Sequence, residues 1–266
     1  MKKVYFPTII AVVFLLVGLT TGVVLVKYNQ EYRTSASSET NPKNVRITNV
    51  NRDSFTVTWT TDKEVDGFVK YTESGLTSKV ALDKFSNSFT HHVEIKNLKS
   101  DVKCSFQIGS GSEIYDNNGI EWVVETTSLP NNAGSNSITG KVLGFNETPV
   151  ENALVYVTAG SSSTLSATTS QKGVWIINLS DLKTSNLFSF QQVDQDTILE
   201  ISVQAGPLGI SSAKILASDA DPVPNMQIGS SHDFRNIKKD EDGVLPNASL
   251  ELPKTSTTEA EPSEDI

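Results

Sequence analysis

Cysteine and histidine are scarce in this sequence: its 266 residues include one cysteine, Cys104, and three histidines. A single cysteine cannot close a disulfide within the chain, so hydrophobic packing must stabilise the folded parts. His91 and His92 are adjacent in a segment that alternates like a strand, which directs their side chains to opposite faces. Because side chains on opposite faces cannot easily share a metal ion, we expect no metal site and no cofactor.

The sequence also lacks the short motifs that carry catalysis. It contains no Gly-x-Ser-x-Gly nucleophile elbow, no glycine-rich phosphate loop and no His-Glu-x-x-His helix. Acidic residues outnumber basic ones, 31 to 22, and the basic residues form no run longer than Lys238-Lys239. A nucleic-acid surface needs clustered basic residues, so we expect no nucleic-acid partner. We predict that the protein is not an enzyme; a hydrolase whose carboxylates converge only in the fold is the alternative.

A long apolar run occurs at the N-terminus. Residues 4–26 carry no charge, and as a helix at ~1.5 Å per residue they would extend ~34 Å, enough to span a bilayer core. Lys2 and Lys3 precede this run, so the positive-inside rule places the N-terminus in the cytoplasm and the bulk of the chain outside the cell membrane. We predict a single-pass transmembrane anchor over residues 1–27 and a flexible stalk over residues 28–41. A cleaved signal peptide is the alternative.

After the stalk, short alternating segments replace the long apolar run. Phe55, Val57 and Trp59 alternate with threonines, and similar segments recur up to about residue 130, separated by Asn, Asp, Gly and Ser. About seven such strands are the number expected of an immunoglobulin-like sandwich. We therefore predict an all-β fold.

The stretch NPKNVRITNVNRDSFTVTWTTDKEVDGFVKYTES resembles the opening half of a fibronectin type III domain. Trp59 stands where the family has its core tryptophan, Tyr71 takes the aromatic position of the third strand, and Leu98 opens the turn before the tyrosine corner. Cys104 replaces the tyrosine of that corner, and a thiol supplies neither the packing of the ring nor its hydroxyl hydrogen bond. The resemblance implies a fibronectin type III-like domain over residues 42–130 with a weakened or rebuilt corner.

A second β-rich segment follows a linker of Asn, Gly and Ser over residues 131–136. Its beginning, SITGKVLGFNETPVENALVYVTAG, resembles a carboxypeptidase regulatory-like domain, with Gly140 on the first strand and Trp175 on a later one. The resemblance implies a second, prealbumin-like sandwich over residues 137–230. Residues 231–266 are acidic and rich in Pro, Thr, Ser and Glu, so we predict a disordered tail.

An anchor, a stalk and two tandem β-sandwiches resemble the organisation of bacterial surface proteins. We expect a role in surface display, adhesion, or interaction with a protein or glycan; an accessory subunit of an envelope enzyme or secretion complex is the alternative. Tyr115, Asp116, Asn117 and Asn118 are the best candidates for a binding loop, because one aromatic residue stands among polar turn residues. An ordinary hairpin turn is the competing interpretation of these residues.

Overall fold

The computed structural model describes residues 39–74, 76–132, 134–237 and 246. The predicted anchor, most of the stalk and most of the acidic tail lie outside these ranges. The described chain is all-β, which confirms the predicted fold class. It also contains four short 3-10 turns: η1 (Phe145–Glu147), η2 (Leu179–Asp181), η3 (Gly206–Leu208) and η4 (Ala217–Asp219). Within the described ranges, no helix has both the length and the hydropathy needed to cross a membrane.

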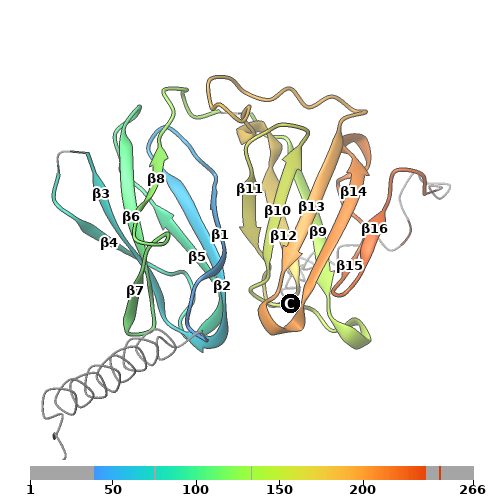
Figure 1. The fold of residues 1–266 in the computed structure, drawn as a ribbon. Helices are drawn as coiled ribbons and strands as arrows, with labels where there is room; N and C mark the ends of the chain where they lie inside the picture. The colour runs from blue at the N-terminus through green and yellow to red at the C-terminus, as the bar shows by residue number, and fades with distance from the viewer. Residues whose placement is uncertain (1–38, 75, 133, 238–245, 247–266) are drawn as a thin grey trace, which may run out of the picture.

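The N-terminal sandwich consists of two sheets that face each other across one core (Figure 1). Its strands are β1 (Lys43–Thr48), β2 (Phe55–Val65), β3 (Gly67–Glu73), β4 (Lys79–Leu82), β5 (Ser88–Ile95), β6 (Lys103–Ser110), β7 (Glu113–Tyr115) and β8 (Trp122–Glu125). One sheet has the order β1-β2-β5 and the other the order β4-β3-β6-β7, with β8 also paired to β6. This division of strands is immunoglobulin-like, as the sequence pattern predicted.

The C-terminal sandwich combines a five-stranded and a three-stranded sheet. Its strands are β9 (Ser137–Leu143), β10 (Leu154–Ala159), β11 (Leu165–Thr168), β12 (Val174–Asn178), β13 (Ile198–Gln204), β14 (Ile210–Leu216), β15 (Met226–Gln227) and β16 (Ser231–Asp233). The sheet orders are β11-β10-β13-β14-β16 and β12-β9-β15. Strand β16 and the buried Phe234 extend this sandwich beyond residue 230, the boundary expected from the sequence. Composition does not reveal this extension, because the polar strand β16 joins the sheet through its backbone pairing with β14.

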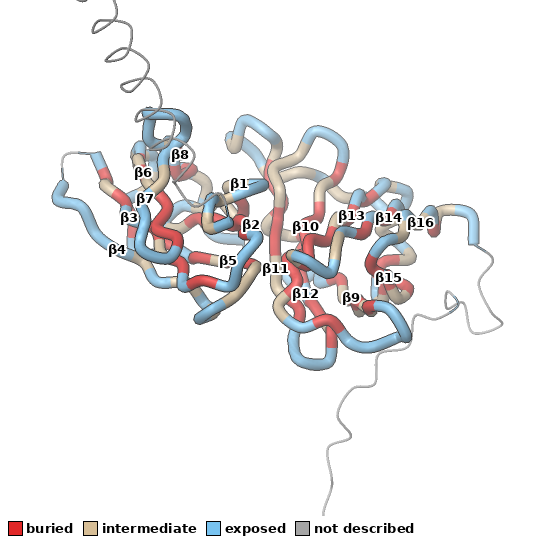
Figure 2. Tube along the Cα trace, turned by 60° about the horizontal axis from the view of Figure 1, so that its bottom comes forward, coloured by how far each residue is buried: buried red, intermediate tan, exposed pale blue. Residues whose placement is uncertain are grey.

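The buried apolar residues form two separate clusters, one in each sandwich (Figure 2). Trp59, Tyr71 and Leu98 belong to the N-terminal cluster, and Trp175 belongs to the C-terminal one. Trp175 packs against Gly140. A Cβ added to Gly140 would lie 2.5 Å from the Cζ2 atom of Trp175. Glycine is therefore required at this position of β9 by the close approach of the ring.

The threonine side chains of β2 are buried nearly as deeply as its apolar ones. Phe55, Val57 and Trp59 point into the core and are 0 % exposed, whereas Thr56 and Thr58 point to the opposite face and are 2 % and 0 % exposed. Alternation along a strand explains the first group but predicts that the second group meets solvent. The outer face of this sheet is covered by the C-terminal sandwich.

The contact between the two sandwiches is made largely by polar groups. Asn49 continues the edge of β11: its backbone N–H donates to the Thr164 carbonyl (3.1 Å), and its side chain accepts from the Ser166 N–H (2.8 Å) and donates to the Ser166 carbonyl (3.0 Å). Lys183, which is 2 % exposed, donates from Nζ to Oδ1 of Asn51 at 2.6 Å. Because these groups satisfy one another, polar residues can be buried here without a large cost.

The structure rebuilds the corner at which Cys104 replaces tyrosine. Cys104 is fully buried, and burial, reinforced by the nearby Glu73 carboxylate, raises the pKa of its thiol to about 11. Oε1 of Glu73 accepts a hydrogen bond from the Lys99 N–H (3.0 Å), and Thr126 Oγ1 donates to the Lys99 carbonyl (2.7 Å) and accepts from the Val102 N–H (3.1 Å). Side chains from β3 and from the segment after β8 thus hold the turn.

Candidate functional site

The predicted binding loop begins at Tyr115, the last residue of β7, and continues into the turn before β8. Tyr115 is half-buried, and its hydroxyl forms a hydrogen bond of 2.7 Å with Oγ1 of Thr40. Oδ1 of Asp116 accepts from the Gly119 N–H (2.7 Å), and Asn118 adopts the left-handed conformation with φ 57°. The Asp116 carboxylate is thus engaged within the turn, as in an ordinary hairpin turn, whereas the Tyr115 hydroxyl bonds to Thr40, which precedes β1. The binding role of this loop stays a prediction.

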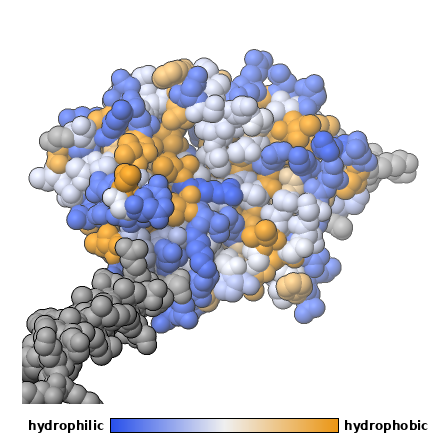
Figure 3. Space-filling view, in the orientation of Figure 1, coloured by the Kyte–Doolittle hydropathy of each residue, from blue (hydrophilic) through white to orange (hydrophobic). Residues whose placement is uncertain are grey.

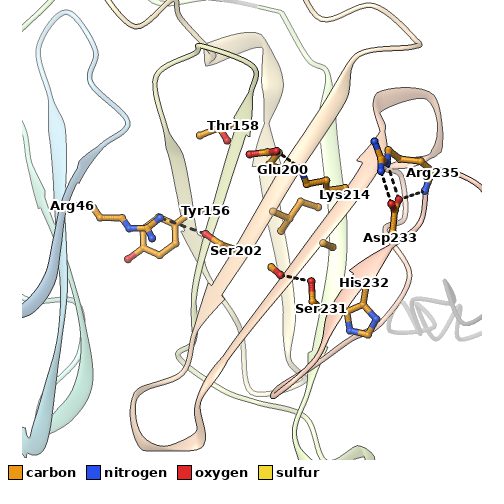
Figure 4. Close-up of a pocket in the computed structure, with 13 residues that line it drawn as sticks. Arg46, Tyr156, Thr158, Glu200, Ser202, Lys214, Ser231, His232, Asp233 and Arg235 are labelled. Carbon is orange, nitrogen blue, oxygen red and sulfur yellow. Dashed lines mark hydrogen bonds and ion pairs between the residues drawn. The ribbon is translucent and has the colours of Figure 1, made fainter.

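A cleft of about 510 Å³ lies elsewhere, on the outer face of the five-stranded sheet beside β1 (Figure 4). Alternate residues of each strand point to this face, so their side chains form two rows across the sheet. We define the hydroxyl row as Tyr156, Ser202, Ser212 and Ser231, and the charged row as Thr158, Glu200, Lys214 and Asp233. Neighbours in each row are paired residues of adjacent strands, which fixes their spacing.

The three charged members of the charged row, Glu200, Lys214 and Asp233, are all engaged in ion pairs. Lys214 Nζ lies 2.8 Å from Oε1 of Glu200, and Arg235 donates from Nε to Oδ1 of Asp233 at 2.8 Å. The hydrogen bonds from Arg235 lower the pKa of Asp233 to about 2, so this carboxylate stays ionised at neutral pH. The row presents charges of both signs on side chains that are about half exposed.

Arg46 of β1 forms the side of the cleft that belongs to the N-terminal sandwich. Its guanidinium carbon lies 4.2 Å from the ring centroid of Tyr156, and its Nη1 lies 3.4 Å from Oγ of Ser202. The ring beneath it is fixed: Tyr156 is 1 % exposed, and its hydroxyl forms a hydrogen bond of 2.9 Å with Oγ1 of Thr58. Burial raises the pKa of Tyr156, so the guanidinium stacks on a neutral phenol. Arg46 forms no ion pair with any carboxylate of the described chain.

The serine hydroxyls of the cleft are placed for hydrogen bonding rather than for nucleophilic attack. Ser212 Oγ and Ser231 Oγ lie 2.9 Å apart and bond to each other. The ring of His232 stacks on Phe234 at 5.1 Å, and its Nε2 accepts from the Gln227 N–H at 3.3 Å. A nucleophilic serine needs a base directed at its hydroxyl, and this histidine lone pair is directed at the backbone instead. The described residues also contain no group of His, Cys, Asp and Glu side chains that could hold a metal ion.

His91 has the partners of a catalytic histidine but not the exposure. Its Nδ1 lies 2.7 Å from Oδ2 of Asp83, its Nε2 lies 3.2 Å from Oγ1 of Thr61, and its ring stacks on Trp59 at 4.7 Å. Because His91 is 0 % exposed, no substrate can reach it, and the network serves to satisfy a polar ring in the core. His92 points the other way and is partly exposed, so the prediction of opposite faces is confirmed.

Sequence patterns did not reveal the cleft. Its residues come from five strands of two sandwiches, and the polar positions of β13 and β14 look like ordinary solvent-facing residues of alternating strands. The alternation could have identified the outward rows, but not Arg46, which reaches them only because the two sandwiches pack together.

No protein-family model and no curated protein matches the chain. Similar solved structures include a "Myokine structure" (15% identity over 34% of this chain and 99% of that chain, TM-score 0.29). They also include a two-domain fibronectin type III segment of chicken tenascin (10% identity, 66% of this chain and 99% of that chain, TM-score 0.26). The FN1–FN3 domains of chicken CNTN1 match with 14% identity over 66% of this chain and 64% of that chain, TM-score 0.27. These neighbours include fibronectin type III sandwiches, but the likeness is distant, and the fold class rests on the strand order of the chain itself.

Proposed function

We propose that this protein is a membrane-anchored, extracytoplasmic interaction protein that acts in surface display or adhesion, and that it is not an enzyme. The observation that carries the proposal is the polar cleft, which is walled by both sandwiches and exposes hydroxyls and charges without an activated nucleophile. Residues 1–27 form the anchor in this proposal, with the N-terminus in the cytoplasm. The C-terminal sandwich is of the carboxypeptidase regulatory-like kind, and the host is bacterial.

The test of this proposal is protease accessibility in intact cells. A full-length chain with an epitope tag at the C-terminus is expected to lose the tag when protease is added outside, while a cytoplasmic control protein stays intact. The N-terminal mass after membrane extraction should include residues 1–27. Protection of the tag would contradict the proposed topology, and a new N-terminus after the apolar run would show a cleaved, secreted protein.

An accessory role in an envelope complex is the second candidate, and an exposed apolar row supports it. Four residues are paired neighbours on the outer face of the sheet β4-β3-β6-β7: Leu82, Phe68, Gly109 and Ile114. Leu82 and Ile114 are 77% and 51% exposed, and the half-buried Phe68 ring between them lies over the buried Gly109. In Figure 3, apolar side chains gather over the N-terminal sandwich on the left, with smaller patches on the right. Exposed apolar side chains on a sheet face can dock a partner chain.

Purification from detergent-solubilised membranes distinguishes the two roles. An accessory subunit is expected to bring down one membrane protein at constant stoichiometry, and the variant Leu82→Ser should lose it. Leu208→Ser is the matched control, because Leu208 is 55% exposed on η3 of the other sandwich. Purification without a stoichiometric partner would favour the adhesion role.

A further inference from the structure

Arg46 carries the unneutralised charge of the cleft. The cations that line it are Arg46, Lys214 and Arg235 and the anions are Glu200 and Asp233, so with His232 neutral the cleft has a net charge of three minus two, or +1. Lys214 and Arg235 are each paired with one of these anions, at 2.8 Å in both cases. The excess positive charge is therefore located on the Arg46 guanidinium, in a protein whose net charge is −9.

The orientation of the Arg46 guanidinium favours the binding of an anion. Stacking on the buried Tyr156 ring fixes its plane, and the weak hydrogen bond to Ser202, at 3.4 Å, occupies one of its five N–H donors. A planar guanidinium binds a carboxylate through two parallel hydrogen bonds, and a fixed plane reduces the conformational entropy lost on binding.

The rest of the cleft suits a ligand with many hydroxyl groups. Ser202, Ser212 and Ser231 place three hydroxyls in line across adjacent strands. The bond between Ser212 and Ser231 uses one hydroxyl hydrogen, so two donors and at least one acceptor site on each oxygen remain for a ligand. Two apolar side chains of the lining, Ile201 and Ala213, are 1% and 3% exposed and lie beneath the floor. Protein interfaces usually depend on exposed aromatic or aliphatic anchors, and the lining of this cleft offers none, since its tyrosine is buried.

From this combination we infer that the cleft binds an acidic carbohydrate, with a uronic-acid carboxylate on Arg46 and sugar hydroxyls along the serine hydroxyls of the hydroxyl row. The inference rests on the proposed function and specifies its ligand. The volume of about 510 Å³ lies within the ~300–1,000 Å³ typical of small-molecule sites and accommodates a short oligosaccharide segment.

Titration calorimetry on the full-length chain in detergent tests this inference, with tetragalacturonate as the acidic probe and galactotetraose as the neutral one. We expect binding of the acidic oligosaccharide that weakens as salt is raised, and at least tenfold weaker binding of the neutral one. Arg46→Ala should reduce the affinity for tetragalacturonate at least tenfold. Arg52→Ala, which removes an exposed arginine that does not line the cleft, should leave it unchanged.

A second variant is needed because Arg46→Ala could weaken binding indirectly, by changing the contact between the sandwiches. Ser212 is exposed in the middle of the hydroxyl row, so Ser212→Tyr fills the cleft without changing a buried residue and should abolish binding while the melting temperature stays the same. The inference is overturned if tetragalacturonate does not bind, if galactotetraose binds equally well, or if either cleft variant binds like the wild type. Tighter binding of hexaglutamate than of tetragalacturonate would also overturn it, by assigning the cleft to acidic peptides. These outcomes are independent of the protease test, so the proposed ligand can be rejected while the proposed membrane topology is supported.

Discussion

Replacing Asn51 by alanine removes the amide that bonds to the buried ammonium of Lys183 across the contact between the sandwiches. In the wild type Lys183 Nζ donates to Oδ1 of Asn51 at 2.6 Å and to the carbonyl of Asp181 at 3.0 Å, and burial lowers the pKa of the lysine. After the substitution a nearly inaccessible cation retains one hydrogen-bond partner, the Asp181 carbonyl. Hydrogen bonds to charged groups contribute about 1.5–3 kcal/mol each, so we expect Asn51→Ala to lower the free energy of unfolding by about 2 kcal/mol.

The consequence for thermal unfolding depends on whether the sandwiches unfold together. For a cooperative unit of 150–250 residues, each kcal/mol corresponds to roughly 2–4 °C, so the melting temperature should fall by about 4–8 °C. Tryptophan fluorescence reports on both sandwiches, because Trp59 and Trp175 are buried in different cores. We expect a single transition that shifts as a whole.

A double-mutant cycle isolates the contact. Lys183→Met removes the buried ammonium, so Asn51→Ala should cost little in that background, and the coupling energy should be at least about 1 kcal/mol. Asn117→Ala, in an exposed turn, is the control and should change stability by less than about 0.5 kcal/mol. Coupling near zero, or two separate melting transitions, would refute the idea that the polar contact joins the two sandwiches.

Three further predictions concern single sites. Gly140→Ala should destabilise the C-terminal sandwich by about 1–3 kcal/mol in urea unfolding, because the new Cβ would lie 2.5 Å from Trp175; a change below about 0.5 kcal/mol would mean that the ring can move. Burial, and next the positive charge of Lys84, lower the pKa of His92, so the unfolded chain binds more protons below the ordinary pKa of 6.5. Stability should therefore fall as pH decreases from about 6.5 through the lowered pKa, and His92→Gln should flatten that part of the pH profile. Cys104, with its pKa raised to about 11 by burial, should react with a thiol reagent only after denaturation, and rapid labelling of the native protein would contradict its burial.

The sequence by itself determined the fold class and most of the strands. Phe55, Val57 and Trp59 alternate with threonines. Period-two alternation is a local property, so it can be recognised without knowing which strands pair with one another. The turns between strands are equally local, since Asp116 and Gly119 bond within four residues of each other. The all-β class could be predicted from such short-range patterns, and the site could not.

Tertiary structure decided the rest. Threonines that the alternation assigns to solvent are buried against the second sandwich, and the guanidinium of Arg46 meets Ser202, 156 residues away in the chain, because the two sandwiches pack together. A hydrogen bond between distant residues leaves no periodic trace in either segment, since each partner looks like an ordinary polar surface residue. Local patterns therefore specify which face of a strand is polar, and only the packing of the sandwiches decides whether that face meets solvent, another sheet or the cleft.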